Sequence, residues 1–240
     1  ISVLARRHGL STEAPPLIDL TGAAAYRIIP SRYPTIDLFE DVASSDELEA
    51  VWAVEALTNE RLLEQAGELM RVPKADWLVG LNGSSYVMAA FTHINPEGAR
   101  FSTGDFGGYY CAPQLDTAIK ETVYHQERIF GYTNEPAQKV QMRVLFTEFD
   151  ATLADITQEP FISSPLYHAT DYSQSKVFAQ AQKMQGRDGI HYCSVRHTGH
   201  TCYVLYRPCL VTKVTQAEHL EYHWNGRSIT NILSIKLYGD

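Results

Sequence analysis

The sequence predicts a single domain of the mixed α+β class. Short runs rich in β-branched and aromatic residues recur along the chain, and segments with apolar residues at helical spacing lie between them. The two kinds alternate irregularly, which favours an α+β fold over a doubly wound parallel sheet. With 240 residues, 45% hydrophobic and 20% charged, the chain can bury a substantial core without disulfides.

The first part of the chain predicts an arm followed by a strand. Residues 1–20 contain Pro15-Pro16 and show no clear periodicity, so we expect an N-terminal arm before a domain of residues 21–240. Tyr26-Arg-Ile-Ile is apolar and β-prone, and Pro30 follows it directly. This pattern predicts a short strand that ends at the proline.

A helix is expected next, because Ser44 or Ser45 can cap its free backbone amides. The following Asp46-Glu47 suits the positive end of a helix. Apolar residues then repeat at helical spacing at Leu48, Val51 and Trp52. A second helical segment over residues 60–66 is predicted to stop at Gly67.

The middle of the chain predicts strands around one long helix. Strands are expected at residues 77–79, 86–91 and 108–112. Residues 115–130 read as a helix with one apolar face, made of Leu115, Ala118, Ile119, Thr122 and Ile129. Residues 140–146 alternate between apolar and mostly polar side chains, which predicts a strand at an edge of the sheet.

The last third of the chain predicts one helix and several strands. The helix covers residues 173–185 and ends at Gly186. Strands are expected at residues 190–195, 202–206, 210–214 and 229–237.

Composition excludes several classes of function. The net charge is −8 and no basic run is present, so a general nucleic-acid or membrane-surface binder is not expected. The four cysteines form no Cys-x-x-Cys pair, which favours free thiols in a reducing, cytoplasmic compartment. The N-terminus lacks the apolar core of a signal peptide, and no apolar run is long enough to span a bilayer.

Common nucleotide and metal motifs are absent from the sequence. The glycines of Gly104–Gly108 have the wrong spacing for a dinucleotide fingerprint, and no P-loop lysine or nucleophile elbow is found. His219 and His223 lack the glutamate of the zinc-protease pattern. His197, His200 and Cys202 have no second cluster to complete a zinc site. We therefore expect no metal.

Four polar residues stand out by their chemistry: Arg27, Arg100, Tyr110 and Glu121. Arginine forks bind pyrophosphate, an aromatic ring stacks on a base, and a carboxylate stabilises a cationic sugar, so this set points to cleavage of NAD. Ordinary explanations remain open for each residue. Glu121 can be a solvated helix residue, Arg100 a surface arginine, Arg27 half of an internal ion pair, and Tyr109 and Tyr110 packing residues.

These segments together resemble the RES domain family of bacterial toxins, which are usually encoded beside an Xre-type antitoxin. The similarity runs from about residue 26 to residue 206. The motifs that carry it are Tyr26-Arg27, Arg100-Phe-Ser with Gly104, Tyr110-Cys-Ala, Glu121, Asp171-Tyr-Ser-Gln-Ser, the segment from Gly186 to Arg196 that contains Ser194, and Val204-Leu-Tyr.

The resemblance implies an ADP-ribosyltransferase-like split β-core with surrounding helices and NAD as the substrate. It implies that Arg27 and Arg100 hold the NAD phosphates or the adjoining ribose and that Tyr110 borders the nicotinamide. Glu121 is expected to stabilise the developing oxocarbenium ion. Ser194 is expected to position the substrate, and His125 to orient or activate the acceptor.

The long link between Arg27 and Arg100 departs from compact members of the family. An insertion at about residues 40–95 makes the chain resemble the longer, ParT-like ADP-ribosylating subtype. Transfer of ADP-ribose to a protein is the expected activity, with an Xre-family antitoxin as partner. Two alternatives stay open, an NAD phosphorylase or hydrolase and an inactive antitoxin-binding module. A sugar N-glycosidase would need a second carboxylate, for which Glu148 and Asp150 are candidates.

Overall fold

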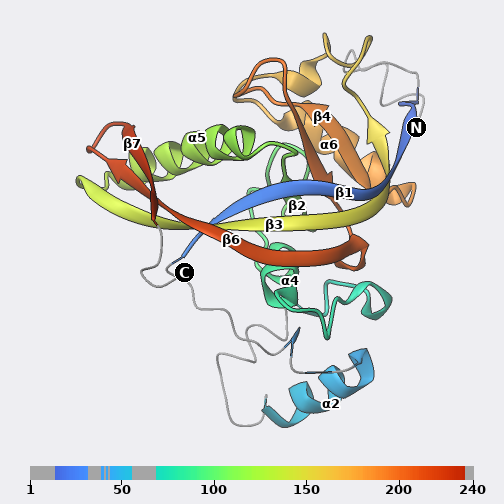
Figure 1. Cartoon of the computed structure of the whole chain (residues 1–240). Helices are drawn as coiled ribbons and strands as arrows, with labels where there is room; N and C mark the ends of the chain where they lie inside the picture. The colour runs from blue at the N-terminus through green and yellow to red at the C-terminus, as the bar shows by residue number, and fades with distance from the viewer. Residues whose placement is uncertain (1–13, 32–38, 41, 43, 56–68, 236–240) are drawn as a thin grey trace.

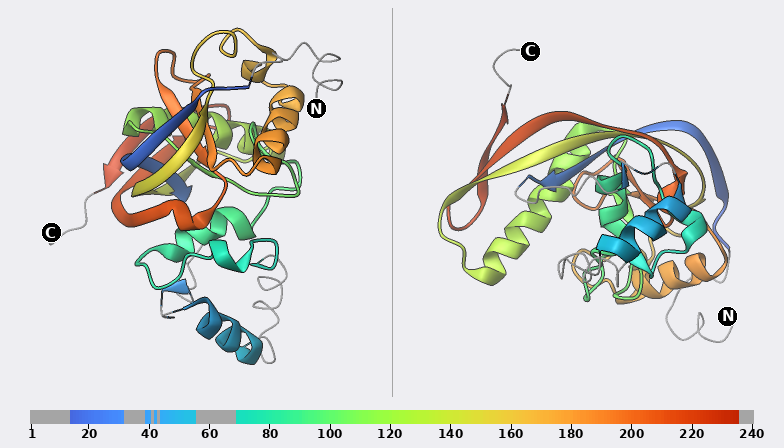
Figure 2. Two further views of the ribbon diagram at one scale, coloured as in Figure 1. Left: turned by 90° about the vertical axis from the view of Figure 1, so that its right-hand side faces the viewer. Right: turned by 90° about the horizontal axis from the view of Figure 1, so that it is seen from below.

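The computed structural model describes residues 14–31, 39, 40, 42, 44–55 and 69–235 (Figure 1). These residues form one mixed sheet with helices packed on both of its faces (Figures 1 and 2). The predicted α+β class is therefore confirmed. No helix in the described part of the chain is both long and apolar enough to cross a membrane.

Seven strands make up the sheet, in the order β2-β5-β4-β3-β6-β7, and β1 pairs with β3 outside this path. Only the short pairing of β3 with β4 is parallel among the strand pairs of the described residues. The strand bounds are β1 Leu17–Pro30, β2 Tyr109–Cys111, β3 Gln138–Asp155, β4 Gly189–Cys193, β5 Thr201–Leu205, β6 Val211–Trp224 and β7 Ile229–Ile235.

Strand β3 joins two halves of the sheet. Its partner along one edge is β1, while the other edge pairs first with β6 and then, over Leu153–Asp155, with β4. Ala112, the residue after β2, pairs with Tyr26 of β1 through two backbone hydrogen bonds. Tyr26 N donates to Ala112 O at 2.7 Å, and in return Ala112 N to Tyr26 O at 2.9 Å. Two contacts therefore join the long strands β1, β3, β6 and β7 to the short strands β4, β5 and β2. One is the pairing of β3 with β4, and the other is the bridge between Tyr26 and Ala112.

Helices cover the two faces of the sheet separately. Helices α5 (Leu115–Thr133) and α6 (Ser173–Met184) pack on one face, and α4 (Ser84–Thr92) packs on the other. Helix α2 (Ser45–Glu55) lies beyond α4, farther from the sheet (Figures 1 and 2). Neighbouring side chains of β3 point to opposite faces, so Val144 belongs to the first core and Leu145 to the second. The described parts of the expected insertion therefore supply the second layer.

One predicted strand is a helix in the structure. Residues 86–91 lie in α4, and the expected strand at residues 77–79 follows a 3-10 turn at Lys74–Asp76 without joining a sheet. A short continuous apolar run fits a buried helix as well as a strand, so the sequence pattern does not distinguish the two. The buried positions of α4 are Ser84, Ser85, Val87, Met88, Phe91 and Thr92, which share one helical face.

The ends of three strands also differ from the prediction. Strand β1 begins at Leu17, inside the expected arm, because residues 17–20 pair with β3 and the Thr152 hydroxyl donates to Asp19 at 2.6 Å. Strand β3 is central rather than at an edge and continues to Asp155. Strand β6 continues to Trp224, well past the expected end at residue 214, because a cross-strand partner on β3 faces it.

The remaining predicted elements agree with the structure within a few residues. The Ser44 hydroxyl accepts the Glu47 backbone N–H at 3.2 Å, as expected for the cap of α2. Helix α6 ends before Gly186, which has a φ of 72° and donates to the Lys183 carbonyl. Ile129 of α5 was expected on the apolar face of the helix, but it is exposed in the structure, so this assignment is wrong. The helical segment predicted at residues 60–66 and the end of the last strand beyond residue 235 lie outside the described residues.

Candidate functional site

A cavity of about 270 Å³ lies where β1, β2 and α5 meet. Five of the six predicted site residues line it, namely Arg27, Arg100, Tyr110, Glu121 and His125. The sixth, Ser194, lies directly behind the carboxylate of Glu121 and bonds to it. The volume is close to the lower end of the range for ligand pockets, about 300–1,000 Å³.

Arg27 reaches the cavity from β1. Its Nη1 atom donates to the Tyr110 carbonyl oxygen at 2.9 Å, and the guanidinium carbon lies 4.7 Å from the centre of the Tyr109 ring. Its Nε atom is buried and has no hydrogen-bond partner. Among the described residues no carboxylate forms an ion pair with Arg27, so the expected alternative of an internal ion pair finds no support there.

The two tyrosines of β2 face opposite sides, as a strand requires. Tyr109 is fully buried in the second core and shares a 2.6 Å hydrogen bond with the Thr147 hydroxyl. Tyr110 faces the cavity, but its hydroxyl accepts the Phe101 N–H at 3.0 Å and donates to the Ser102 hydroxyl at 3.2 Å. Burial raises the pKa of Tyr110 to about 12, so it stays neutral and offers its ring to a ligand.

A tight loop positions Arg100. Gly98 adopts a φ of 69°, and the Ala99 N–H donates to the Ser102 carbonyl at 3.0 Å across the loop. Arg100 is only 8% exposed, which excludes the surface arginine considered from the sequence. Its Nη1 atom donates to the carbonyl oxygens of Leu166 at 3.0 Å and His168 at 2.8 Å.

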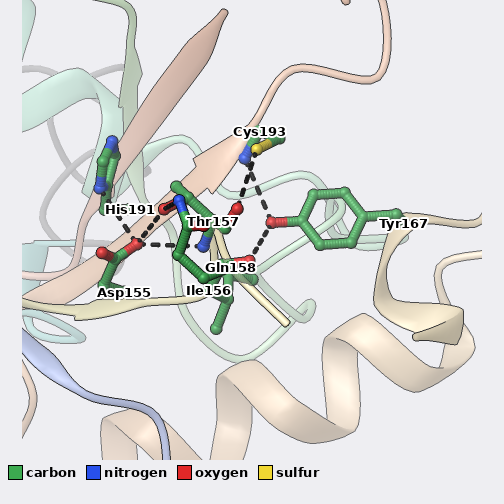
Figure 3. A network of polar contacts seen from close by, with 7 residues as sticks. All are labelled: Asp155, Ile156, Thr157, Gln158, Tyr167, His191 and Cys193. Carbon is green, nitrogen blue, oxygen red and sulfur yellow. Dashed lines mark hydrogen bonds and ion pairs between the residues drawn. The ribbon is translucent and has the colours of Figure 1, made fainter. Parts of the chain in front are cut away.

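A polar network holds Tyr167 (Figure 3), which lies between Leu166 and His168, the two residues whose carbonyls accept Arg100. The Tyr167 hydroxyl donates to the Ile156 carbonyl at 2.6 Å and accepts the Cys193 N–H at 3.2 Å (Figure 3). Asp155 accepts hydrogen bonds from Thr157 and lies 3.2 Å from the ring of His191. The network ties the loop after β3 to β4, so the carbonyls that receive Arg100 are held in place.

Glu121 projects from the second turn of α5 toward the cavity. The Ser194 hydroxyl donates to its Oε1 atom at 2.6 Å. The same hydroxyl accepts the backbone N–H groups of Arg196 at 3.2 Å and His197 at 2.8 Å. These contacts direct the hydroxyl proton at Glu121, so Ser194 orients the carboxylate and is not arranged as a nucleophile. No cation pairs with Glu121 within the described ranges.

His125 lies one turn after Glu121 on α5 and is exposed at the cavity. Desolvation by the surrounding protein lowers the pKa of His125 to about 4, and the charges of Arg128, Arg196 and Arg100 lower it further. The imidazole is therefore neutral near neutral pH and can accept a hydrogen bond, but it is only a weak proton acceptor.

Several residues of the site had no assigned role in the sequence. Tyr172 lines the cavity, and the Arg100 guanidinium lies 4.5 Å from the centre of its ring. Arg196 donates to the Ala169 carbonyl and lies over the Tyr124 ring at 3.3 Å. Tyr172 falls inside one of the motifs quoted above, but its position over Arg100 depends on segments far apart in the sequence.

Other sequence candidates lie elsewhere. Glu148 pairs with Lys213 at 2.9 Å, and Asp150 accepts the Gly22 N–H at 2.7 Å, and neither lines the cavity. A second carboxylate facing Glu121, as a sugar N-glycosidase would need, is therefore not provided by these two residues. The rings of His197 and His200 stack at 3.7 Å. In the part of the chain that is described, no three His, Cys, Asp or Glu side chains gather as a metal site.

Comparisons with known proteins identify relatives. The RES domain model matches residues 69–225, a range that includes Arg100, Tyr110, Glu121 and Ser194 and leaves out Arg27. An uncharacterised protein of Sinorhizobium fredii, y4oC, is 28% identical over 208 residues, which cover 85% of this chain and 84% of the relative.

The crystal structure of the M. tuberculosis MbcT–MbcA toxin–antitoxin complex is also similar, with 12% identity and a TM-score of 0.45 over 84% of this chain and 86% of that chain. A TM-score this low carries no weight for the site. The family model, in contrast, matches more than half of the sequence, and this chain belongs to the RES domain family.

Proposed function

We propose that this protein is a cytoplasmic toxin of a toxin–antitoxin pair that cleaves NAD at the nicotinamide–ribose bond and transfers ADP-ribose to a protein. The observation that carries the proposal is the pair of arginines beside Glu121. Both guanidiniums line one cavity, and neither has a carboxylate partner among the described residues.

The two arginines support an anionic ligand. A buried charge without a partner is unfavourable, so such a group is usually paired or waits for a ligand of opposite charge. Arg27 keeps an unused Nε donor, and Arg100 is bound only to backbone carbonyls and to an aromatic ring. The pyrophosphate of NAD offers oxygens that guanidinium forks bind in pairs.

Glu121 supports cleavage of the glycosidic bond. The bond from the ribose C1′ atom to the nicotinamide nitrogen breaks, and its electron pair leaves with nicotinamide as a neutral base. The ribose then carries positive charge, which a carboxylate held by Ser194 can stabilise. Tyr110 lines the cavity and its hydroxyl is already bonded to Phe101 and Ser102, so its ring is the part available to the nicotinamide.

The acceptor attacks C1′ and must lose a proton when it is a hydroxyl group. The proton passes to solvent water at the open side of the cavity, where the neutral imidazole of His125 orients the acceptor by accepting a hydrogen bond from it. Transfer to a protein side chain would fit the longer, ParT-like subtype that the sequence resembles.

A second outcome uses the same cavity. Three arginines act on His125, and their positive field favours an anionic acceptor such as phosphate over a protein side chain. Water, a neutral acceptor, is the remaining alternative. The protein would then deplete NAD as a phosphorylase or hydrolase. In both cases we propose an Xre-family antitoxin as partner, one that places a carboxylate against Arg27 and Arg100.

The test is to incubate the purified protein, free of antitoxin, with labelled NAD in buffers with and without phosphate, alone and with cell lysate. Nicotinamide release with label on a discrete protein supports the transferase. Release without protein label supports the phosphorylase or hydrolase, and its phosphate dependence separates these two. If no nicotinamide is released under any condition, the catalytic proposal is wrong and an inactive antitoxin-binding module is favoured.

A further inference from the structure

Arginine and tyrosine side chains alternate outward from the cavity along α5. We call this set the arginine–tyrosine ladder, and its members are Arg100, Tyr172, Arg196, Tyr124, Arg128 and Tyr132. Arg100 and Tyr172 line the cavity, with the guanidinium 4.5 Å from the ring centre. Arg196 contacts the Tyr172 hydroxyl at 3.5 Å and lies 3.3 Å over the Tyr124 ring.

The outer part of the ladder follows one face of α5. The Arg128 guanidinium lies 5.7 Å from the ring centres of both Tyr124 and Tyr132. Glu121, His125, Arg128 and Tyr132 are spaced three or four residues apart, so they follow one another on the same side of the helix. Arg128 lies about 10 Å beyond Glu121 along the axis, at about 1.5 Å per residue. Helix α5 leads from the site toward β7 (Figure 1).

The positive charges of the ladder are not neutralised by direct ion pairs. Within the described residues, no carboxylate forms an ion pair with Arg100, Arg196 or Arg128. The neighbouring acid Glu127 is turned away and accepts the Ile229 N–H of β7 at 2.7 Å. Tyr132 is 76% exposed, so its ring is free to meet a ligand. A cationic fork beside an exposed aromatic ring suits a ligand that has both phosphate and a flat base.

We propose that the outer ladder, Tyr124, Arg128 and Tyr132, binds the adenylate half of NAD. This inference rests on the proposed function. The nicotinamide ribose must meet Glu121 inside a cavity of about 270 Å³. The cavity is at the small end for ligand pockets, so the adenylate half extends out of it, and the ladder begins at the cavity wall. Arg128 meets the adenylate phosphate, and a tyrosine ring stacks on the adenine, as bases do on aromatic side chains.

The test compares NAD with nicotinamide mononucleotide, which has the same reacting bond but lacks the adenylate half. Wild type, Arg128→Ala, Tyr132→Ala and the matched control Arg71→Ala would be assayed for nicotinamide release from both compounds. Arg71 is an exposed arginine on the segment that packs on the opposite face of the sheet. Binding of ADP-ribose by calorimetry gives a second readout that needs no turnover.

We expect Arg128→Ala to lower kcat/KM for NAD by about 10- to 100-fold, the range for a lost charge-assisted hydrogen bond. The value for nicotinamide mononucleotide should stay within about twofold of wild type, and ADP-ribose affinity should fall by the same factor as kcat/KM for NAD. Tyr132→Ala should act in the same direction with a smaller loss. Arg71→Ala should change none of these values.

Equal losses for NAD and nicotinamide mononucleotide would overturn the assignment, and so would an unchanged affinity for ADP-ribose. The assignment would also be overturned if Arg128→Ala raised the KM for phosphate and left the ratio of kcat/KM for NAD to that for nicotinamide mononucleotide unchanged. The ladder would then bind the acceptor phosphate. If wild type releases no nicotinamide but binds ADP-ribose in an Arg128-dependent way, the subsite stands and the proposed catalysis fails. If wild type neither binds ADP-ribose nor turns over NAD, both proposals fail.

Discussion

Arg207 and Arg100 are both at least partly withdrawn from solvent, and they differ in whether a carboxylate neutralises the charge. Arg207, next to the end of β5, forms ion pairs with Asp188 and, at 3.7 Å, with Asp76. Its side chain is 42% exposed. Arg100, in the cavity, is only 8% exposed and has no carboxylate partner among the described residues.

The difference is the reverse of what stability alone would favour. A more buried charge loses more hydration and gains more from a partner, so Arg100 should be the better paired of the two. The Arg207 cluster, made of Arg207, Asp188 and Asp76, has its charges balanced within the chain. The cavity leaves its positive charge for a ligand, and functional sites commonly keep such unfavourable arrangements.

The largest effect is expected from Glu121→Gln, which removes the negative charge from the cavity and keeps the shape of the side chain. Nicotinamide release should fall on the order of a hundred- to thousand-fold, as for other groups that stabilise a charged transition state. The matched control is Glu127→Gln on the same helix, because Glu127 bonds to β7 and not to the cavity. Near-full turnover by Glu121→Gln would show that another group stabilises the cationic sugar.

Arg27→Gln tests the unpaired cavity charge. We expect kcat/KM for NAD to fall by about 10- to 100-fold, because a charge-assisted contact to phosphate is lost. The free energy of unfolding should fall by only about 1–2 kcal/mol, since the interactions removed from the folded protein are the bond to the Tyr110 carbonyl and the contact with the Tyr109 ring. Urea unfolding and nicotinamide release measure the two effects. A large loss of stability at unchanged turnover would make Arg27 a structural residue.

Asp188→Ala tests the balanced cluster and should give the opposite result. Asp188 pairs with Arg207 and accepts the Thr152 N–H at 2.9 Å, so its loss leaves that N–H without a partner and Arg207 with only the more distant Asp76. We expect the free energy of unfolding to fall by about 1–3 kcal/mol. Turnover of NAD by the folded variant should remain at the wild-type level. If NAD turnover falls while the free energy of unfolding is unchanged, the Arg207 cluster contributes to the function of the cavity, and the two regions are not independent.

The smallest effect is a pH dependence from His125. Its pKa in the folded protein is about 4, below the usual 6.5, so the unfolded chain takes up a proton first as the pH falls. The contribution to stability is fully present above about pH 6.5 and is lost as the pH falls toward about 4. In His125→Gln, urea unfolding should show a smaller loss between neutral pH and about pH 5 than in wild type. Parallel curves would mean that His125 titrates normally.

The sequence predicted best where periodicity is long and unambiguous. Helix α5 and helix α6 each show repeated apolar positions, and the glycine after α6 ends it with a positive φ. Residues 86–91 were assigned wrongly because a short apolar run does not distinguish a buried helix from a strand. Strand β1 was placed too late because its first residues are mixed in polarity, and only pairing with β3 makes them a strand.

For the candidate site, the sequence by itself determined which chemical groups are available. The resemblance of these motifs to the RES domain family predicts one site made of Arg27, Arg100, Tyr110 and Glu121, and in the structure these four residues line one cavity. Only the tertiary structure decided how these groups are connected. Ser194 meets Glu121 across 73 positions of sequence, and Arg100 reaches carbonyls more than sixty residues away.

The physical reason is that the pairing of charges depends on the distances between side chains in the folded protein. A sequence lists acids and bases, but it does not show that Arg207 lies between two aspartates while the cavity arginines have none within the described residues. Coulomb energy depends on distance and on the polarity of the surroundings, and both are fixed only when distant segments pack together.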